Sequence, residues 1–275
     1  MIWIGGAQGA GKSNFAWRLS RARDLPLHPV DLWSYDHQGR VPDGDSLDDQ
    51  LARGAEAAAD AFESVSQLRL ELVLADIAAR DLGAVPVIVE GPQLTPGMAG
   101  SIPAGSLPAG WGVWLVHDPD RTRLARAERV ARAATLGGSV EADSRISRLV
   151  ERDAVIAGRV RAAAAEGGRP VIEVSAVPDW PAITAAATAA LGPALDAAPR
   201  LTPGRELSQQ RRYENRAAER QGRLWAAAAG FTAMPEYPFG CECGASRCRA
   251  TWTGSPNCYA AVTADERPLI AHRPA

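Results

Sequence analysis

The chain has 275 residues, a formal net charge of −2 and 46% apolar residues. This length is enough for one large domain, or for a medium domain with a small appendage, and the near-neutral charge excludes a globally basic nucleic-acid binder. No apolar run approaches the roughly 20 residues of a membrane span, and the glycine-rich start does not resemble a signal peptide. We therefore expect a cytoplasmic protein without a membrane partner.

The predicted elements alternate between strands and helices. Short apolar runs predict strands at 2–4, 27–30, 85–89, 113–116 and 171–174. Helical periodicity predicts helices at 13–23, 47–79, 121–132, 146–165 and 183–191. This alternation predicts an α/β fold with a five-stranded parallel sheet between two helical layers, and ligands are expected at the carboxyl ends of its strands.

The last third of the chain changes in composition. The segment 192–204 carries three prolines and is typical of a linker, 205–230 is a charged helical segment, and all four cysteines follow it. We interpret 1–195 as the main domain, 196–204 as a linker, and 205–275 as a small module of a helix plus a cysteine cluster.

Residues 6–13 match the phosphate-binding pattern G-x-x-x-x-G-K-[ST]. The glycines let backbone amides face the phosphates, the lysine reaches the β- and γ-phosphates, and the serine hydroxyl ligates Mg²⁺. A chance match is the alternative, but a strand precedes the pattern, a helix follows it, and it contains the only lysine of the chain. The predicted nucleotide contacts are Gly6, Gly9, Ala10, Gly11, Lys12, Ser13 and Asn14.

Acidic residues follow two of the other predicted strands. Glu90 ends the strand 85–89, where a carboxylate can orient Mg²⁺ and so contact the bound nucleotide, although it could also cap the following turn. Asp31 follows the strand 27–30, where it could accept the proton of an acceptor hydroxyl as a catalytic base. Asp36, His37 and Arg40 belong to the same segment, and we predict that they contact the acceptor with Asp31; a surface loop is the alternative.

Arginines dominate the helix that follows the fourth strand. Five of them lie within twelve residues, at positions 121, 123, 126, 129 and 132. Their spacing suits a lid that closes on a triphosphate, because guanidinium groups pair bidentately with phosphate oxygens. A solvated helix face is the competing interpretation. We select Arg126, Arg129 and, on the next helix, Arg152 as catalytic candidates.

The chain contains the motifs GGAQGAGKS, VIVEGPQ and ERDAVIAGRV, together with Asp31 and the arginine-rich stretch. Through these features it resembles the nucleoside- and nucleotide-kinase group of P-loop proteins. That group includes adenylate kinase, shikimate kinase and chloramphenicol phosphotransferase. The chain is also similar to bacterial P-loop kinase-like proteins that end in a Cys-Glu-Cys-Gly…Cys tail. The resemblance implies a P-loop NTPase fold with a lid, and a kinase that uses ATP and Mg²⁺ to phosphorylate a hydroxyl of a small molecule such as a nucleoside or a sugar.

The cysteines follow the spacing C-x-C-x₄-C-x₉-C, with His272 further along. Four soft ligands can close a tetrahedral zinc site and stabilise a module that has little core. We name Cys241, Cys243, Cys248 and Cys258 as candidate zinc ligands, the first three ahead of Cys258 or His272. Disulfides and unpaired thiols are the alternatives.

Two other functions remain as alternatives to a small-molecule kinase. One is a P-loop ATPase or switch whose partner binds the C-terminal module, although the chain has no NKxD-like guanine-selecting motif. The other is a nucleic-acid-associated kinase, for which aromatic residues beside arginines could form a platform. The balance of acids in the tail makes nucleic acid the weaker choice, and the sequence leaves the oligomeric state open.

Overall fold

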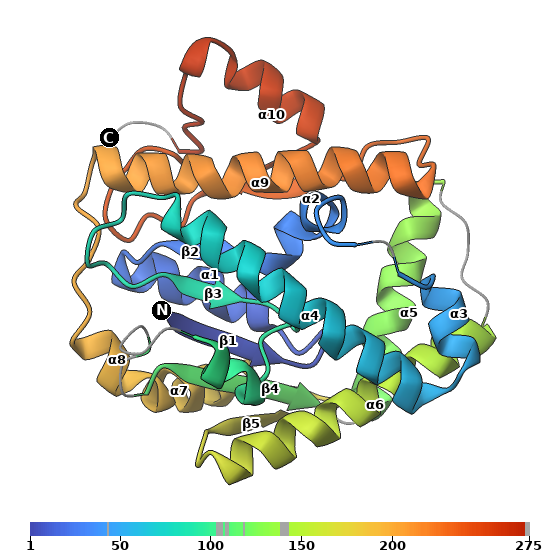
Figure 1. Cartoon of the computed structure of the whole chain (residues 1–275). Coiled ribbons are helices and arrows are strands. Elements are labelled where there is room, and N and C mark those ends of the chain that lie inside the picture. Colours follow the sequence, from blue (N-terminus) through green and yellow to red (C-terminus); the bar gives the residue numbers. More distant parts are fainter. Residues whose placement is uncertain (43, 103–106, 108–109, 118, 138–142, 273–275) are drawn as a thin grey trace.

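The computed structural model describes residues 1–42, 44–102, 107, 110–117, 119–137 and 143–272. Five parallel strands form the central sheet in the order β2-β3-β1-β4-β5 (Figure 1). Their bounds are Ile2–Gly6 (β1), Leu27–Pro29 (β2), Ile88–Glu90 (β3), Gly112–His117 (β4) and Val171–Val174 (β5). The predicted α/β fold with a five-stranded parallel sheet is therefore confirmed.

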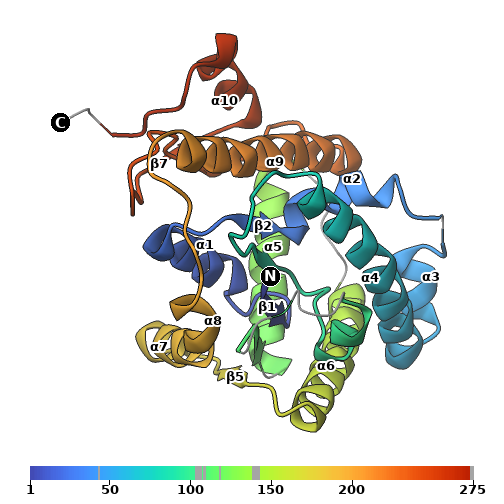
Figure 2. The ribbon, with the colours of Figure 1, turned by 60° about the vertical axis from the view of Figure 1, so that its left-hand side comes forward.

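Helices cover both faces of the sheet (Figure 2). Ile2 and Ile4 of β1 point into one core, shared with α1 (Lys12–Arg23), α7 (Trp180–Ala190) and α8 (Gly192–Asp196). Trp3, between them, points into a second core under α4 (Ala55–Ala78) and α6 (Asp143–Glu166). Because successive side chains of a strand point to opposite faces of the sheet, each apolar run contributes side chains to both cores. The fold therefore has three layers, the sheet and a layer of helices on each face.

Several predicted boundaries were wrong. The single helix expected at 47–79 is two helices, α3 (Leu47–Ala52) and α4, and the chain breaks between them at Gly54, whose φ of 103° lies outside the helical range. The strand expected at 85–89 starts only at Ile88 and ends at Glu90. The expected linker 192–204 begins with α8.

Short helical segments also lie where the sequence indicated only loops. A 3₁₀ turn (η1, Val30–Trp33) and α2 (Ser34–Gln38) follow β2, and a second 3₁₀ segment (η2, Pro96–Ser101) follows β3. The arginine-rich helix α5 (Pro119–Thr135) packs along α6. None of the helices in the described part of the chain combines the length and the hydropathy that a membrane crossing requires.

The C-terminal segment lies against the edge of the sheet (Figure 1). Its helix α9 (Arg205–Ala229) packs on β2, η1 and α2. A hairpin of β6 (Tyr237–Gly240) and β7 (Thr251–Gly254), the helix α10 (Pro256–Val262) and a 3₁₀ turn (η3, Ala264–Glu266) complete it. The contacts that tie α9 to the sheet side include the ion pair of Arg21 with Glu214 and the hydrogen bond from Gln210 to the Leu27 carbonyl at 2.9 Å. The division into two domains at 196–204 stays a prediction.

Candidate functional site

The phosphate loop connects β1 directly to α1. Gly9 and Gly11 both adopt left-handed backbone angles, with φ of 79° and 81°. A Cβ atom on Gly11 would lie 2.4 Å from the ring of Trp180, at the start of α7. Both the backbone conformation and this close approach therefore require glycine at position 11, the second glycine of the pattern G-x-x-x-x-G-K-[ST].

Lys12 is buried under the loop that it belongs to. Its side chain is only 4% exposed, and its Nζ donates a hydrogen bond to the Ala7 carbonyl at 2.7 Å. Burial lowers the pKa of Lys12, while the carboxylates of Glu90 and Asp31 act in the opposite direction. The buried ammonium, whose charged form Glu90 and Asp31 favour, can exchange its contact with the Ala7 carbonyl for a contact with a phosphate oxygen.

Glu90 lies at the carboxyl end of β3, beside β1 and β2. It pairs in register with Ile4 and with Pro29, so it faces the start of the phosphate loop. The residue is 1% exposed, and burial raises the pKa of its carboxyl to about 7, although Lys12 and a hydrogen bond with Ser13 oppose the rise. Its Oε1 has no hydrogen-bond partner among the described residues.

These oxygen donors suit a magnesium ion. Mg²⁺ prefers carboxylate, hydroxyl and phosphate oxygens, and an unpartnered buried carboxylate oxygen is costly without a ligand. Glu90 and Ser13 offer such oxygens side by side next to the loop. The residues therefore fit the ion that the sequence predicted for this place.

Asp31 lies in η1, two residues after the end of β2. Its side chain is exposed, and Gln93 donates a hydrogen bond from Nε2 to its Oδ1 at 3.2 Å. Asp31 also acts electrostatically on Lys12 and Glu90. The structure thus brings together the acid after β2, the acid at the end of β3 and the loop lysine.

Asp36, His37 and Arg40 form a network beside the site. His37 is fully buried, and its Nε2 lies 2.8 Å from Asp76 of α4. Arg40 bridges Asp36 at 3.3 Å and Asp76 at 3.2 Å, while Arg220 of α9 pairs with the other oxygen of Asp36. Because these groups already hold one another, the network fixes α2 between α4 and α9, and the predicted contact with the acceptor stays a proposal.

The predicted arginines occupy different positions. Arg126 and Arg152 both clamp the buried Asp153, with their shortest contacts at 2.6 Å and 2.7 Å. Arg129 is exposed and lines a cleft of about 970 Å³ together with Arg152 and the loop residue Gln8. The cleft therefore opens between the arginine-rich helix and the phosphate loop.

The sequence interpretation missed three residues of the site. His117 ends β4; its ring contacts the Gln8 carbonyl of the loop and the Thr122 hydroxyl, the latter at 2.7 Å. Asp153 follows directly on the predicted Arg152. Arg69 of α4 lines the cleft near Asp31, and its Nε has no hydrogen-bond partner among the described residues. His117 could have been predicted as a site residue because it lies at the end of a predicted strand, whereas nothing in the sequence distinguishes Arg69 from the other arginines.

Three of the four predicted zinc ligands lie together. The ligand atoms of Cys241, Cys243, Cys248 and His272 are all within 4.8 Å of one another. Cys258 was a wrong choice for the fourth position, because α10 holds it exposed and outside this group. His272 reaches the cluster instead, since the chain after η3 returns along the hairpin, where Leu269 accepts a hydrogen bond at its carbonyl from the Glu242 N–H at 2.7 Å.

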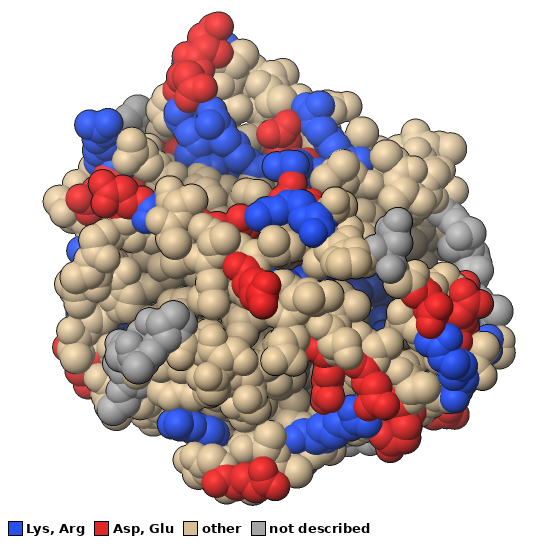
Figure 3. Space-filling view, in the orientation of Figure 1, with Lys and Arg blue, Asp and Glu red and all other residues tan. Residues whose placement is uncertain are grey.

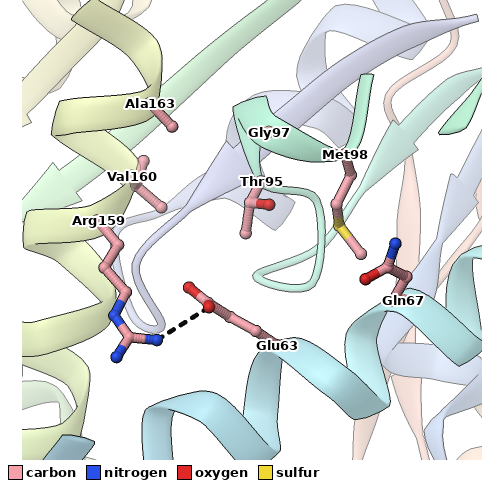
Figure 4. A pocket seen from close by; sticks show the side chains of 8 residues that line it. All are labelled: Glu63, Gln67, Thr95, Gly97, Met98, Arg159, Val160 and Ala163. Atoms are coloured by element: carbon pink, nitrogen blue, oxygen red, sulfur yellow. Dashed lines mark hydrogen bonds and ion pairs between the residues drawn. The ribbon is translucent and has the colours of Figure 1, made fainter. Parts of the chain in front are cut away.

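Two further features of the described residues lie outside the phosphate loop: a cavity between helices and a charged surface over α9. A cavity of about 300 Å³ between α4, α6 and η2 is lined by Met98, Gln67 and Val160, and Figure 4 shows that its charged residues Arg159 and Glu63 pair with each other at 2.9 Å. Figure 3 shows blue and red side chains next to each other over α9. Ion pairs of Arg212 and Arg216 with Glu266 belong to this surface.

No family model matches the chain, and no curated protein matches it. Among solved structures, a gluconokinase from Sinorhizobium meliloti 1021 is 16% identical over 71% of this chain and 93% of its own, with a TM-score of 0.38. A sulfotransferase from Alicyclobacillus acidocaldarius is 14% identical over 84% and 95%, with a TM-score of 0.42. EHV4-TK complexed with TP4A is 12% identical over 81% and 97%, with a TM-score of 0.33.

Proposed function

We propose that this protein is a kinase that transfers the γ-phosphoryl group of ATP to a hydroxyl of a small molecule. The observation that supports this most strongly is the convergence of Lys12, Ser13, Glu90 and Asp31 at the carboxyl ends of β1, β2 and β3. A glycine loop that opens a helix binds phosphate, and two acids next to it provide a metal ligand and a base.

Each group has a separate role in this reaction. The amides of the phosphate loop and the N-terminus of α1 bind the phosphates, and Lys12 neutralises charge on the group that is transferred. Ser13 and Glu90 would hold Mg²⁺, which supplies further charge neutralisation when bound. Asp31 takes the proton of the acceptor hydroxyl as the new oxygen–phosphorus bond forms and the bond to the bridging oxygen of ADP breaks. Arg129 and Arg152 approach from the cleft and bind phosphate oxygens.

ATP binding by calorimetry tests the loop assignment. Lys12→Ala is expected to weaken Mg²⁺-dependent ATP binding at least tenfold, because no other lysine exists and the loop loses its ammonium. Arg18→Ala is the matched control, since Arg18 is exposed on the same helix, and we expect its affinity to stay within twofold of the parent. Unchanged ATP binding by Lys12→Ala would contradict the proposed function.

A second measurement tests the base. Asp31→Asn keeps the side-chain volume and the contact with Gln93 but removes the proton acceptor. We expect ATP affinity within about threefold of the parent and a loss of at least 100-fold in phosphorylation of an accepted alcohol, within the range typical of general-base catalysis. An equal loss of binding and turnover would assign Asp31 to nucleotide binding instead.

We also propose that Cys241, Cys243, Cys248 and His272 bind a structural zinc ion. Three sulfurs and one imidazole nitrogen form a Cys₃His donor set that suits tetrahedral Zn²⁺. Backbone N–H groups of Ala271 and Ala245 lie 3.4 Å from the sulfurs of Cys241 and Cys243, an arrangement that stabilises thiolates. The ion would fasten the end of the chain to the β6–β7 hairpin.

Metal analysis of protein prepared without added zinc tests this site. The parent and Cys258→Ser are expected to carry one zinc per chain, because Cys258 lies outside the group, whereas Cys243→Ser and His272→Ala should lose most of it. Equal zinc content in Cys243→Ser and in the parent, or metal-free protein with four titratable thiols, would refute the assignment.

A further inference from the structure

A second cavity of about 490 Å³ adjoins the catalytic groups on the side of α9. Its wall includes Ser13, Asp31 and Glu90 at one end, while Ala218 of α9 and Tyr237 of β6 belong to the C-terminal segment. Asp31 and Tyr237 also line the arginine-bearing cleft, so the two hollows meet at the proposed base. A molecule in this cavity would therefore place one end next to Asp31.

The body of the cavity is mainly apolar. Trp17 and Leu27 contribute from the side of α1 and β2, and Leu32, Ala218 and Pro238 contribute from η1, α9 and β6. Pro29 and the aromatic ring of Tyr237 add to this part of the lining, whereas Asn14 and Thr251 contribute polar groups. Such a wall stabilises a hydrocarbon or aromatic surface by removing it from water, and it replaces little of the hydration of a polyol.

Several polar groups along this wall already have partners. Arg21 pairs with Glu214 through contacts of 3.2 Å and 2.8 Å. The Asn215 side chain bonds to both backbone groups of Gly240, at 2.8 Å each. Arg249 also lines the cavity but is exposed to solvent. The oxygen groups next to the phosphate loop lie at the end that holds Asp31, Ser13 and Glu90.

We propose that this cavity binds the phosphoryl acceptor, and that the acceptor is an alcohol with an apolar or aromatic body. The inference rests on the proposed kinase function and narrows its substrate class. The hydroxyl would lie at Asp31, which takes its proton as the oxygen forms a bond to the γ-phosphorus, and the apolar body would lie between Trp17 and Tyr237. The C-terminal segment is then one wall of the substrate site, which gives α9 and the β6–β7 hairpin a role beyond stability.

Ligand-observed NMR with two probe alcohols tests the proposal. Tryptophol, a primary alcohol with an indole body, is expected to bind, and glucose, a polyol, is expected to bind at least tenfold more weakly. Ala218→Trp fills the cavity and should weaken tryptophol binding at least tenfold. Ala228→Trp is the matched control, because Ala228 lies on the same helix, is exposed and lines none of the described cavities.

ATP affinity separates failure of this proposal from failure of the kinase function. Ala218→Trp should bind ATP with an affinity within twofold of the parent, and this binding also shows that the variant folds. If Ala218→Trp does not fold, Trp17→Ala takes its place, with an expected fivefold loss of tryptophol affinity. Absence of tryptophol binding, equal binding of glucose, or no effect of either cavity variant would overturn the acceptor assignment while ATP binding stands. Unchanged ATP binding by Lys12→Ala would instead overturn the kinase function itself.

Discussion

The ion pair between Arg21 and Glu214 is the contact that most directly couples the phosphate-loop helix to the C-terminal segment. The Arg21 and Glu214 side chains are only 3% and 7% exposed, and the two terminal guanidinium nitrogens each contact the carboxylate. Glu214 also accepts a hydrogen bond from Gln210 at 2.6 Å. Glu214→Ala would leave a buried guanidinium without its counter-charge, which costs about 3–5 kcal/mol of the free energy of unfolding.

Urea denaturation followed by circular dichroism measures this cost. With a slope of about 2–3 kcal/mol per molar urea, the midpoint should fall by about 1–2 M. Arg23→Ala is the control: Arg23 pairs with Asp196 at 3.4 Å, but the side chains are 28% and 74% exposed, so the loss should stay below about 1 kcal/mol. The pairwise replacement of Arg21 by Met and Glu214 by Leu should restore most of the stability, because it removes both buried charges.

A loss below about 1 kcal/mol in Glu214→Ala would refute this reasoning. It would mean that water reaches Arg21 once the carboxylate is removed, and hence that α9 separates readily from α1. The measured value therefore reports how firmly the C-terminal segment holds its place beside the phosphate loop.

Two further predictions concern the loop itself. Because burial raises the pKa of Glu90 to about 7, its carboxyl gains a proton as the pH falls through 7, and Mg²⁺-dependent ATP affinity should fall by up to about tenfold per pH unit below that value. Calorimetry across pH 6–8 measures this slope, and we expect Glu90→Gln to lack it. The same slope in that variant would contradict the assignment of Glu90. Gly11→Ala combines a left-handed φ with a clash against Trp180 and should cost about 1–3 kcal/mol and most of the ATP affinity. Gly168→Ala is the control, because Gly168 also has a left-handed φ but no atom lies within 4 Å of the added Cβ. We therefore expect this variant to lose stability through backbone strain alone and to keep its ATP affinity.

Local patterns in the sequence determined the sheet and the phosphate loop. Each buried strand is a short apolar run whose neighbours are turn residues, and the loop needs glycine at defined backbone angles. A short contiguous stretch of the sequence is therefore enough to predict either feature. The acid at position 90 could be placed for the same reason, since it follows such a run directly. The break at Gly54 was missed because the apolar periodicity continues on both sides of it.

Long-range packing decided the rest. Glu214 meets Arg21 across 193 positions of the chain, and the cavity between Trp17 and Tyr237 exists only because α9 crosses the sheet edge. His272 replaces Cys258 in the cysteine group because the chain after η3 returns to the hairpin while α10 points its thiol to solvent. Spacing along the chain can identify a set of suitable donors, but which of them meet depends on where the tertiary fold brings separate segments together.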